Sequence, residues 1–427
     1  MLVATPRIVR ETNRPAFSEP ALKAEIARMR QVDNRTNLGW LAMEYATLAV
    51  VIGLSIGFAE FRASWGLAWG WNVPVFAIAI ALVGGVQHRL AGLGHEASHY
   101  SFLKNKLAND LVADLFCMLP ICTNVHFYRL FHMAHHQYTN DPHHDPDLIN
   151  LGKGKRIDQF PMSREKFIAA IYFIVITGPL TFARYQFEYF YVNVLGKGSN
   201  VYMKRVPDGD AHYAWPRLGT SLGILYILSF VGLQTYLTRT NHTLLLIPGG
   251  LACVFMAGVV IALLPDWAMF RSPFRQPYSE RLAGLIRIAS FTALLVVLGL
   301  LRAPTAARSA IYFNLLWTIP LLTTFPFYML LRDTYQHTNA DKGRLTNTRV
   351  FFSDPFTRWA VFVYGQDMHV PHHLFPAVPH YRLPELHHIL KDWHEQYAEQ
   401  VVECHGTFAN ELGQPTILDV MTTRPKG

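Results

Sequence analysis

Residues 244–264 are LLLIPGGLACVFMAGVVIALL, a stretch without a single charged side chain. An apolar run of about 20 residues is long enough to cross the hydrocarbon core of a bilayer as a helix. Further long apolar runs lie at 39–61, 69–88, 167–183, 219–238, 282–301 and 310–331. The sequence therefore predicts a helical protein that is embedded in a membrane.

The composition supports the same class. Of the 427 residues, 51% are hydrophobic and 16% are charged, whereas soluble domains carry about 25% charged residues. The net charge of +8 comes from short loops and a polar N-terminus, where membrane orientation explains it without nucleic acid. The four cysteines are few and mostly apolar in context, so they predict neither a disulfide framework nor a thiolate metal site.

Seven apolar runs cannot all cross the membrane. Histidine-rich windows at 95–136 and 337–373 should face the same side, yet five runs separate them. We expect 167–183 not to cross, because it is short, contains Gly178-Pro179 and continues into an aromatic amphipathic stretch. The run at 111–122 is too short to span and is expected to lie in the interface.

This topology predicts an all-α polytopic membrane protein with about six transmembrane helices, interfacial helices and a cytoplasmic histidine-rich cap. Its segments would be a cytoplasmic N-terminus (1–38), a membrane domain (39–376) and a cytoplasmic tail (377–427) that packs on the cap. Lysine and arginine are concentrated in the 184–218 and 265–281 loops. The positive-inside rule therefore places these loops, both termini and the histidine windows in the cytoplasm.

Three short windows concentrate histidine: His95-Glu96-Ala97-Ser98-His99, His132-Met133-Ala134-His135-His136 and His369-Val370-Pro371-His372-His373. Residues at i, i+3 and i+4 of a helix share a face, so we expect the first window to offer two imidazoles to one point and the second to offer three. Pro371 is tolerated only in a first helical turn, which predicts that His369 starts a helix. Imidazole suits iron, zinc, copper or nickel, but eight histidines are too many for one tetrahedral zinc and fit two irons.

A further pair lies at the end of the last apolar run. Asp333 and His337 are four residues apart, so a carboxylate and an imidazole share one helix face there. We expect His337 to be a metal ligand, and Asp333 to take a catalytic part by orienting a ligand or binding metal through water. The remaining histidines, such as His143 and His144, are expected not to bind metal directly.

The three windows, in this order and on this membrane pattern, resemble the histidine boxes of the membrane fatty-acid desaturase superfamily. The flanking Tyr138-Thr139-Asn140-Asp141-Pro142 and Leu374-Phe375-Pro376 are similar to family sequence as well. The resemblance covers about residues 39–395, and His337 corresponds to an extra histidine that many members carry. It implies two iron ions bound by His95, His99, His132, His135, His136, His337, His369, His372 and His373.

The same resemblance implies O2-dependent desaturation of a fatty-acyl lipid. The electrons would come from a separate ferredoxin-, rubredoxin- or cytochrome b5-like protein. Hydroxylation or ketolation of a carotenoid or another lipid stays open, because it begins with the same hydrogen abstraction. A zinc intramembrane protease is an alternative, since His95-Glu96-Ala97-Ser98-His99 satisfies H-E-x-x-H, but it leaves the other two windows unexplained. A metal carrier without enzymatic activity is the third option.

Overall fold

The computed structural model describes residues 17–150, 159–193, 202, 216–269, 272, 274–302, 304, 305 and 307–422. Residues 1–16 of the predicted N-terminal segment, most of the 184–218 loop, Arg271 and residues 423–427 lie outside this range. The chain divides into two compact units: unit 1 contains residues 1–51, 81–200 and 321–427, and unit 2 contains residues 52–80 and 201–320. The three segments predicted from the sequence stay a prediction.

The chain folds almost entirely into helices. The first half contains α1 (Pro20–Met29), α2 (Thr36–Phe61), η1 (Trp69–Trp71), α3 (Asn72–Ser98), α4 (Lys106–Ala113), η2 (Asp114–Met118), η3 (Leu119–Ile121), α5 (Val125–Tyr138), α6 (Pro146–Asn150), α7 (Arg164–Phe167), η5 (Ile168–Tyr172), α8 (Ile174–Thr177) and α9 (Pro179–Asn193). Next come α10 (Pro216–Arg239), η6 (Thr243–Leu245), α11 (Leu246–Leu263), η7 (Asp266–Ala268), α12 (Glu280–Arg302), α13 (Arg308–Phe313), η8 (Asn314–Thr318), α14 (Ile319–Leu322) and α15 (Thr324–His337). The C-terminal part contains β1 (Val350–Phe352), α16 (Pro355–Ala360), α17 (His369–Leu374), η9 (His380–Arg382), α18 (Leu383–Trp393), α19 (Glu395–Gln400), β2 (Glu403–His405) and α20 (Ile417–Thr422).

Six helical stretches among the described residues are long and apolar enough to cross a membrane. They are Thr36–Phe61, Trp69–Ser98, Leu218–Arg239, Thr243–Leu263, Glu280–Arg302 and Arg308–His337. Each coincides with one of the predicted runs, so the predicted all-α polytopic membrane fold is confirmed. The side of the membrane on which each loop lies stays a prediction.

The seventh apolar run, 167–183, forms no continuous helix of spanning length. It is divided among α7, a π-turn, α8 and the start of α9, with the break at Gly178-Pro179. The 111–122 run is also broken, because Pro120 and the left-handed Cys122 (φ 64°) end the helix there. The chain then turns by 86° into α5, so this pair of helices is a bent unit and not a straight span.

In unit 1 a buried arginine joins the helices that carry the first two histidine windows. Arg129 of α5 forms an ion pair with Asp110 of α4, with 2.6 Å between Nη2 and Oδ1. The same guanidinium donates to the carbonyl oxygens of Ala97 and Ser98, each at 2.9 Å. These carbonyls lie at the end of α3, and that of Ala97 also accepts from the N–H of Tyr100 and from Asn109 Nδ2. The bonds from Arg129 therefore hold the end of α3 against α5.

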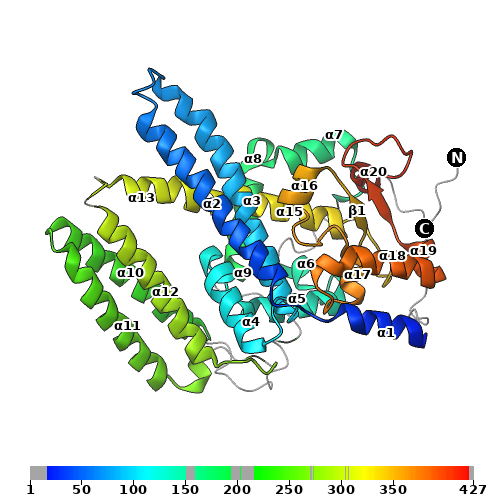
Figure 1. Cartoon of the computed structure of the whole chain (residues 1–427), viewed down its shortest axis with the longest axis horizontal. Coiled ribbons are helices and arrows are strands. Elements are labelled where there is room, and N and C mark those ends of the chain that lie inside the picture. The colour runs from blue at the N-terminus through cyan, green and yellow to red at the C-terminus, as the bar shows by residue number, and fades with distance from the viewer. Residues whose placement is uncertain are drawn as a thin grey trace. The chain divides into compact units, whose positions relative to one another are not determined.

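The third window belongs to the C-terminal part of unit 1, which is orange to red in Figure 1. Strands β1 and β2 pair in parallel, and Val350 also bridges to Met368, directly before α17. A buried apolar cluster from α1, α17 and α18, including Leu22, Leu374 and Leu386, packs beneath this segment. The tail therefore fixes the position at which α17 begins.

Unit 2 is simpler. Helices α10, α11 and α12 pack against one another (Figure 1). Tyr226 and Thr292 share a hydrogen bond of 2.8 Å, and Gln234 donates to the carbonyl of Leu295 at 2.7 Å, so polar contacts join α10 to α12. Such interhelical hydrogen bonds are typical of helices packed in lipid.

The buried Arg129–Asp110 pair should contribute strongly to the stability of the fold. In Asp110→Asn the guanidinium stays buried without its counter-ion, so we expect the free energy of unfolding to fall by about 3–5 kcal/mol. Thermal unfolding in detergent measures this change. Asp266→Asn is the matched control, because it breaks the exposed Arg281–Asp266 pair (2.8 Å) and should cost less than about 1 kcal/mol. Equal effects of the two substitutions would contradict the role assigned to Arg129.

Candidate metal centre

Nine histidines of unit 1 gather in two neighbouring groups. The five-histidine group consists of His95, His99, His132, His136 and His372, and the four-histidine group consists of His135, His337, His369 and His373. Within each group the possible ligand atoms all lie within 4.8 Å of one another. The groups adjoin, since the rings of His136 and His373 are 4.3 Å apart between centroids. The structure thus brings together every histidine that the sequence singled out as a ligand.

The second and third windows each contribute to both groups. In α5, His132 and His136 belong to the five-histidine group, whereas His135 belongs to the four-histidine group. In α17 the arrangement is reversed, because His369 and His373 join the four-histidine group and His372 joins the five-histidine group. The expectation that the second window offers three imidazoles to one point was wrong.

Helix geometry explains this division. At about 100° per residue, positions i and i+4 differ by about 40° around the helix axis, while i+3 lies about 60° away on the other side. The i and i+4 imidazoles therefore converge, and the i+3 imidazole points to a second site. Helix α17 begins at His369, as Pro371 predicted from the sequence.

The distances between nitrogens fit metal coordination. His136 Nε2 lies 2.9 Å from His132 Nε2 and 3.1 Å from His372 Nε2. In the other group, His369 Nε2 lies 2.9 Å from His337 Nε2 and 3.1 Å from His373 Nε2. Two ligands at about 2.1 Å from a metal and at right angles are about 3.0 Å apart. One nitrogen with a single hydrogen cannot donate to two neighbours, whereas a shared cation satisfies all three.

An unpartnered atom in the five-histidine group supports this fit. Among the described residues, His99 Nε2 is buried and has no hydrogen-bond partner. Burial, with a smaller contribution from Arg129, lowers the pKa of His99 to about 3. Burial and neighbouring imidazoles also lower the pKa of His372 and His373 well below the ordinary value. Neutral imidazole is the form that binds metal, so these rings are in the ligating form at neutral pH.

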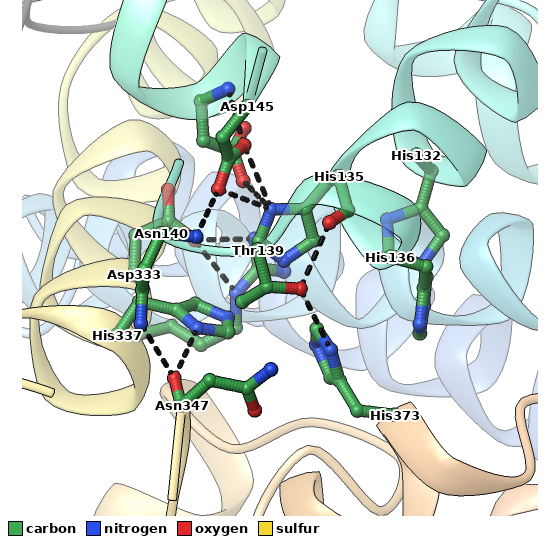
Figure 2. Close-up of polar contacts among 12 residues, drawn as sticks. His132, His135, His136, Thr139, Asn140, Asp145, Asp333, His337, Asn347 and His373 are labelled. Carbon is green, nitrogen blue, oxygen red and sulfur yellow. Dashed lines mark hydrogen bonds and ion pairs between the residues drawn. The ribbon is translucent and has the colours of Figure 1, made fainter. Parts of the chain in front are cut away.

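Hydrogen bonds from the outer nitrogens orient the four-histidine group (Figure 2). His135 Nδ1 lies 3.0 Å from Asp145 Oδ1, and His337 Nδ1 lies 3.3 Å from the carbonyl oxygen of Asn347. His373 Nδ1 lies 3.2 Å from Thr139 Oγ1. A partner on Nδ1 leaves the Nε2 lone pair for a metal, which is how outer residues fix the tautomer of ligating histidines.

Asn140 connects two of these supports. Its backbone N–H donates to Asp145 Oδ2 at 2.8 Å, and its side-chain amide donates to the carbonyl oxygens of Asp341 and Asn347, each at 2.8 Å. Asn140 has a φ of 61°, a left-handed conformation that asparagine tolerates better than most residues. Sequence patterns did not indicate this role, apart from the position of Asn140 in the segment after the second window.

A cavity opens beside both groups. Its lining includes His95 and His132 of the five-histidine group and His135, His337 and His369 of the four-histidine group. Tyr128, Phe131, Tyr189 and Met329 give it an apolar side. Because ligands from both groups border one space, a molecule in the cavity can approach both metal positions.

Asp333 lies in this cavity but outside both groups. Its Oδ1 accepts hydrogen bonds from Arg332, at 2.7 Å from Nη2 and 3.1 Å from Nε. Asp333 and His337 both line the cavity, as their four-residue spacing predicted. A catalytic role for Asp333 stays a prediction.

The remaining polar residues of the first window are engaged elsewhere. Glu96 accepts from the backbone N–H of His380 at 2.9 Å and from Ser101 Oγ at 3.0 Å, and its carboxylate belongs to neither group. The H-E-x-x-H protease alternative needs this glutamate to face metal-bound water, whereas here it connects α3 to η9.

His144 is exposed and pairs with Asp141, also away from both groups.

Comparison with known proteins gives concordant matches. The family model described as "Fatty acid desaturase" matches residues 69–264 and 234–407. A dihydrorhizobitoxine desaturase from Bradyrhizobium elkanii is 32% identical over 117 residues, which are 27% of this chain and 30% of that protein. An sn-1 oleoyl-lipid 12-desaturase from Anabaena variabilis is 34% identical over 101 residues, 23% of this chain and 26% of that protein. The alignments thus span less than a third of each of these curated relatives.

Removing one ligand should weaken metal binding at one group and leave the other group intact. In His337→Ala the four-histidine group loses one of its donors, so we expect metal content to fall from about two ions per chain to about one. Metal analysis of the purified chain measures this. His144→Ala, which removes an exposed histidine, should leave the content unchanged. Full retention of both ions in His337→Ala would exclude His337 as a ligand.

The Asn140 network can be tested without backbone strain. Asn140→Gly keeps the left-handed conformation but removes the side-chain donors, so we expect metal affinity to fall by about 10- to 100-fold. Titration of the metal-free protein with Fe²⁺ gives the affinity. Asn241→Gly is the control, because Asn241 is also left-handed (φ 58°) but belongs to unit 2. An equal loss in both variants would mean that the amide of Asn140 has no specific role.

Proposed function

Because this chain belongs to the fatty acid desaturase family, we propose that it is an O2-dependent oxidoreductase that introduces a C=C bond into a fatty-acyl chain of a lipid. The observation that carries this proposal is the cavity bordered by histidines of both groups. A C–H bond placed there lies within reach of two metal ions at once. The name of the Anabaena relative, an oleoyl-lipid desaturase, supports an acyl lipid as the substrate.

We assign one iron to the five-histidine group and a second iron to the four-histidine group. The nine donors are imidazole nitrogens whose spacing suits two ions with several ligands each. When bound, a pair of irons would share the electrons needed to cleave O2 and would supply the oxidant strength that removal of hydrogen from a methylene requires. Overall, –CH2–CH2–, O2, two electrons and two protons become –CH=CH– and two molecules of water.

The chain's own residues orient the ligands and exclude water. Asp145, Thr139 and the carbonyl of Asn347 hold three imidazoles in the tautomer that presents Nε2. The ring of Tyr128 stacks on His132, with centroids 5.3 Å apart and planes 13° apart, and covers one side of the cavity. The apolar part of the wall, formed by Tyr128, Phe131, Tyr189 and Met329, helps to keep water away from a reactive centre.

The two electrons are proposed to come from a separate ferredoxin-, rubredoxin- or cytochrome b5-like protein. We propose that the histidine groups and both termini face the cytoplasm, because the loops assigned to that side carry most of the lysine and arginine. A basic cytoplasmic face would steer an acidic electron donor toward the centre.

Expression in a host of known lipid composition tests the proposal. We expect the host to accumulate lipids lighter by two hydrogens when it expresses the chain, and His99→Ala to abolish this product. Mass spectrometry of the extracted lipids measures both. Lipids heavier by one oxygen would indicate the hydroxylase alternative, and one zinc per chain with no lipid change would indicate the protease.

A further inference from the structure

The apolar run at 167–183, which forms no straight span, leaves an apolar surface exposed on unit 1. Its inner side chains, such as Ile174 and Phe182, pack against Leu330 of α15. Its outer side chains are half exposed or more: Phe173 (51%), Val175 (52%), Ile176 (77%) and Leu180 (86%). A continuous apolar surface on a protein embedded in a membrane is expected to face lipid.

A loop of the C-terminal tail lies beside this surface. Residues 406–416 connect β2 to α20, and the ring of Phe408 contacts the ring of Tyr172 in η5, with 5.4 Å between their centroids. The N–H of Met162 donates to the carbonyl oxygen of Met421 in α20 at 3.3 Å. Helices α7 and α20 are in contact and lie close together in Figure 1. The tail and the broken apolar run therefore form one surface.

The tip of this loop is apolar and exposed. Phe408 is 45% exposed and Leu412 is 68% exposed. Glu411 is the only charged residue between positions 406 and 416. Two large apolar side chains with one carboxylate between them suit the headgroup region of a bilayer and not its hydrocarbon core.

Asn410 gives the tip a defined shape. Its side-chain amide donates to the carbonyl oxygens of His405 and Gln414, each at 2.8 Å, and its Oδ1 accepts from the N–H of Leu412 at 2.8 Å. The base of the loop is closed as well, because the N–H of His405 donates to the carbonyl oxygen of Pro415 at 2.8 Å. A loop that already has its bound shape loses little conformational entropy when it meets a surface.

Basic side chains border the same surface. Arg164 and Lys166 of α7 are exposed at the N-terminal end of the apolar run, with Glu165 between them. Lysine and arginine next to an interfacial apolar segment are attracted by the negative phosphates of lipid headgroups. The charge around the surface is therefore complementary to a bilayer.

We propose that residues 164–183 and 406–416 together form a membrane-binding face, which rests on the headgroups and outermost acyl carbons of one leaflet. Its occupant is the bilayer and not another protein, because the loop continues an apolar surface of a chain that spans the membrane elsewhere. The hydroxyl of Tyr172 contacts the hydroxyl of Tyr335 in α15, the helix that carries His337. The membrane-binding face thus fixes the depth of the histidine groups relative to the leaflet.

Site-specific crosslinking tests this proposal in a bilayer. The full chain, with the photo-reactive residue benzoylphenylalanine in place of Leu412, is placed in nanodiscs of phosphatidylcholine and phosphatidylglycerol and irradiated. Mass spectrometry then measures the adducts at that position. The matched control carries the same probe in place of Ala398, an exposed residue of α19. We expect about ten-fold more lipid adduct at position 412 than at position 398.

A second probe in place of Phe408 should give the same result as the probe at 412, so the test does not depend on one substitution. Equal lipid adducts at 398 and at the two loop positions would overturn the proposal. Crosslinks from the loop to a second copy of the chain, in place of lipid, would also overturn it, because the surface would then be an interface between copies.

Asn410→Ala tests whether the shape of the loop matters. The substitution removes three hydrogen bonds, so we expect the lipid adduct at position 412 to fall by about ten-fold. Iron content should not change, since the loop lies outside both histidine groups. The control is Asn105→Ala, which removes the N-cap of α4 and should alter the adduct by less than about two-fold. An undiminished adduct in Asn410→Ala would overturn the claim that the loop is shaped in advance for the bilayer.

Discussion

An α-helix turns by about 100° per residue, and the arrangement of the nine histidines depends on this constraint. In a window H-x-x-H-H the first and last imidazoles converge, while the middle one points to a second site. Helices α5 and α17 have the same histidine spacing. Helix α5 gives two ligands to the five-histidine group and one to the four-histidine group, and α17 does the reverse. Two short helices therefore supply six of the nine histidines, three to each group.

Buried charge fixes the helices that this constraint requires. Arg129 is paired with Asp110 and also donates hydrogen bonds to the last carbonyls of α3. One guanidinium therefore contacts both α3 and α4 from its position in α5. Removing such a charge from water is costly unless every donor finds a partner. Asp145 and Asn140 act in the same way closer to the centre, because they satisfy the outer nitrogens and backbone groups of the ligand helices. The ligands are held in place because the residues that support them are themselves buried and hydrogen-bonded.

Much of this arrangement follows from local sequence. Hydrophobic length located the six spanning helices, and Pro371 located the start of α17. The division of the second window between two groups was missed, because i, i+3 and i+4 were treated as one face although they cover about 100° of the helix. The role of Asn140 depends on Asn347, which is distant in sequence. No pattern within a single segment could therefore predict it.

The shared cavity also restricts how the chain crosses the membrane. His95 lies at the end of α3 and His337 at the end of α15, and both line one cavity. Three described spanning helices, α10, α11 and α12, lie between α3 and α15 in the sequence. With three crossings between them, α15 runs in the same direction as α3, so both helices end on the same side. A crossing by residues 167–183 would place the two histidines on opposite sides, so the shared cavity supports the prediction that this segment does not cross.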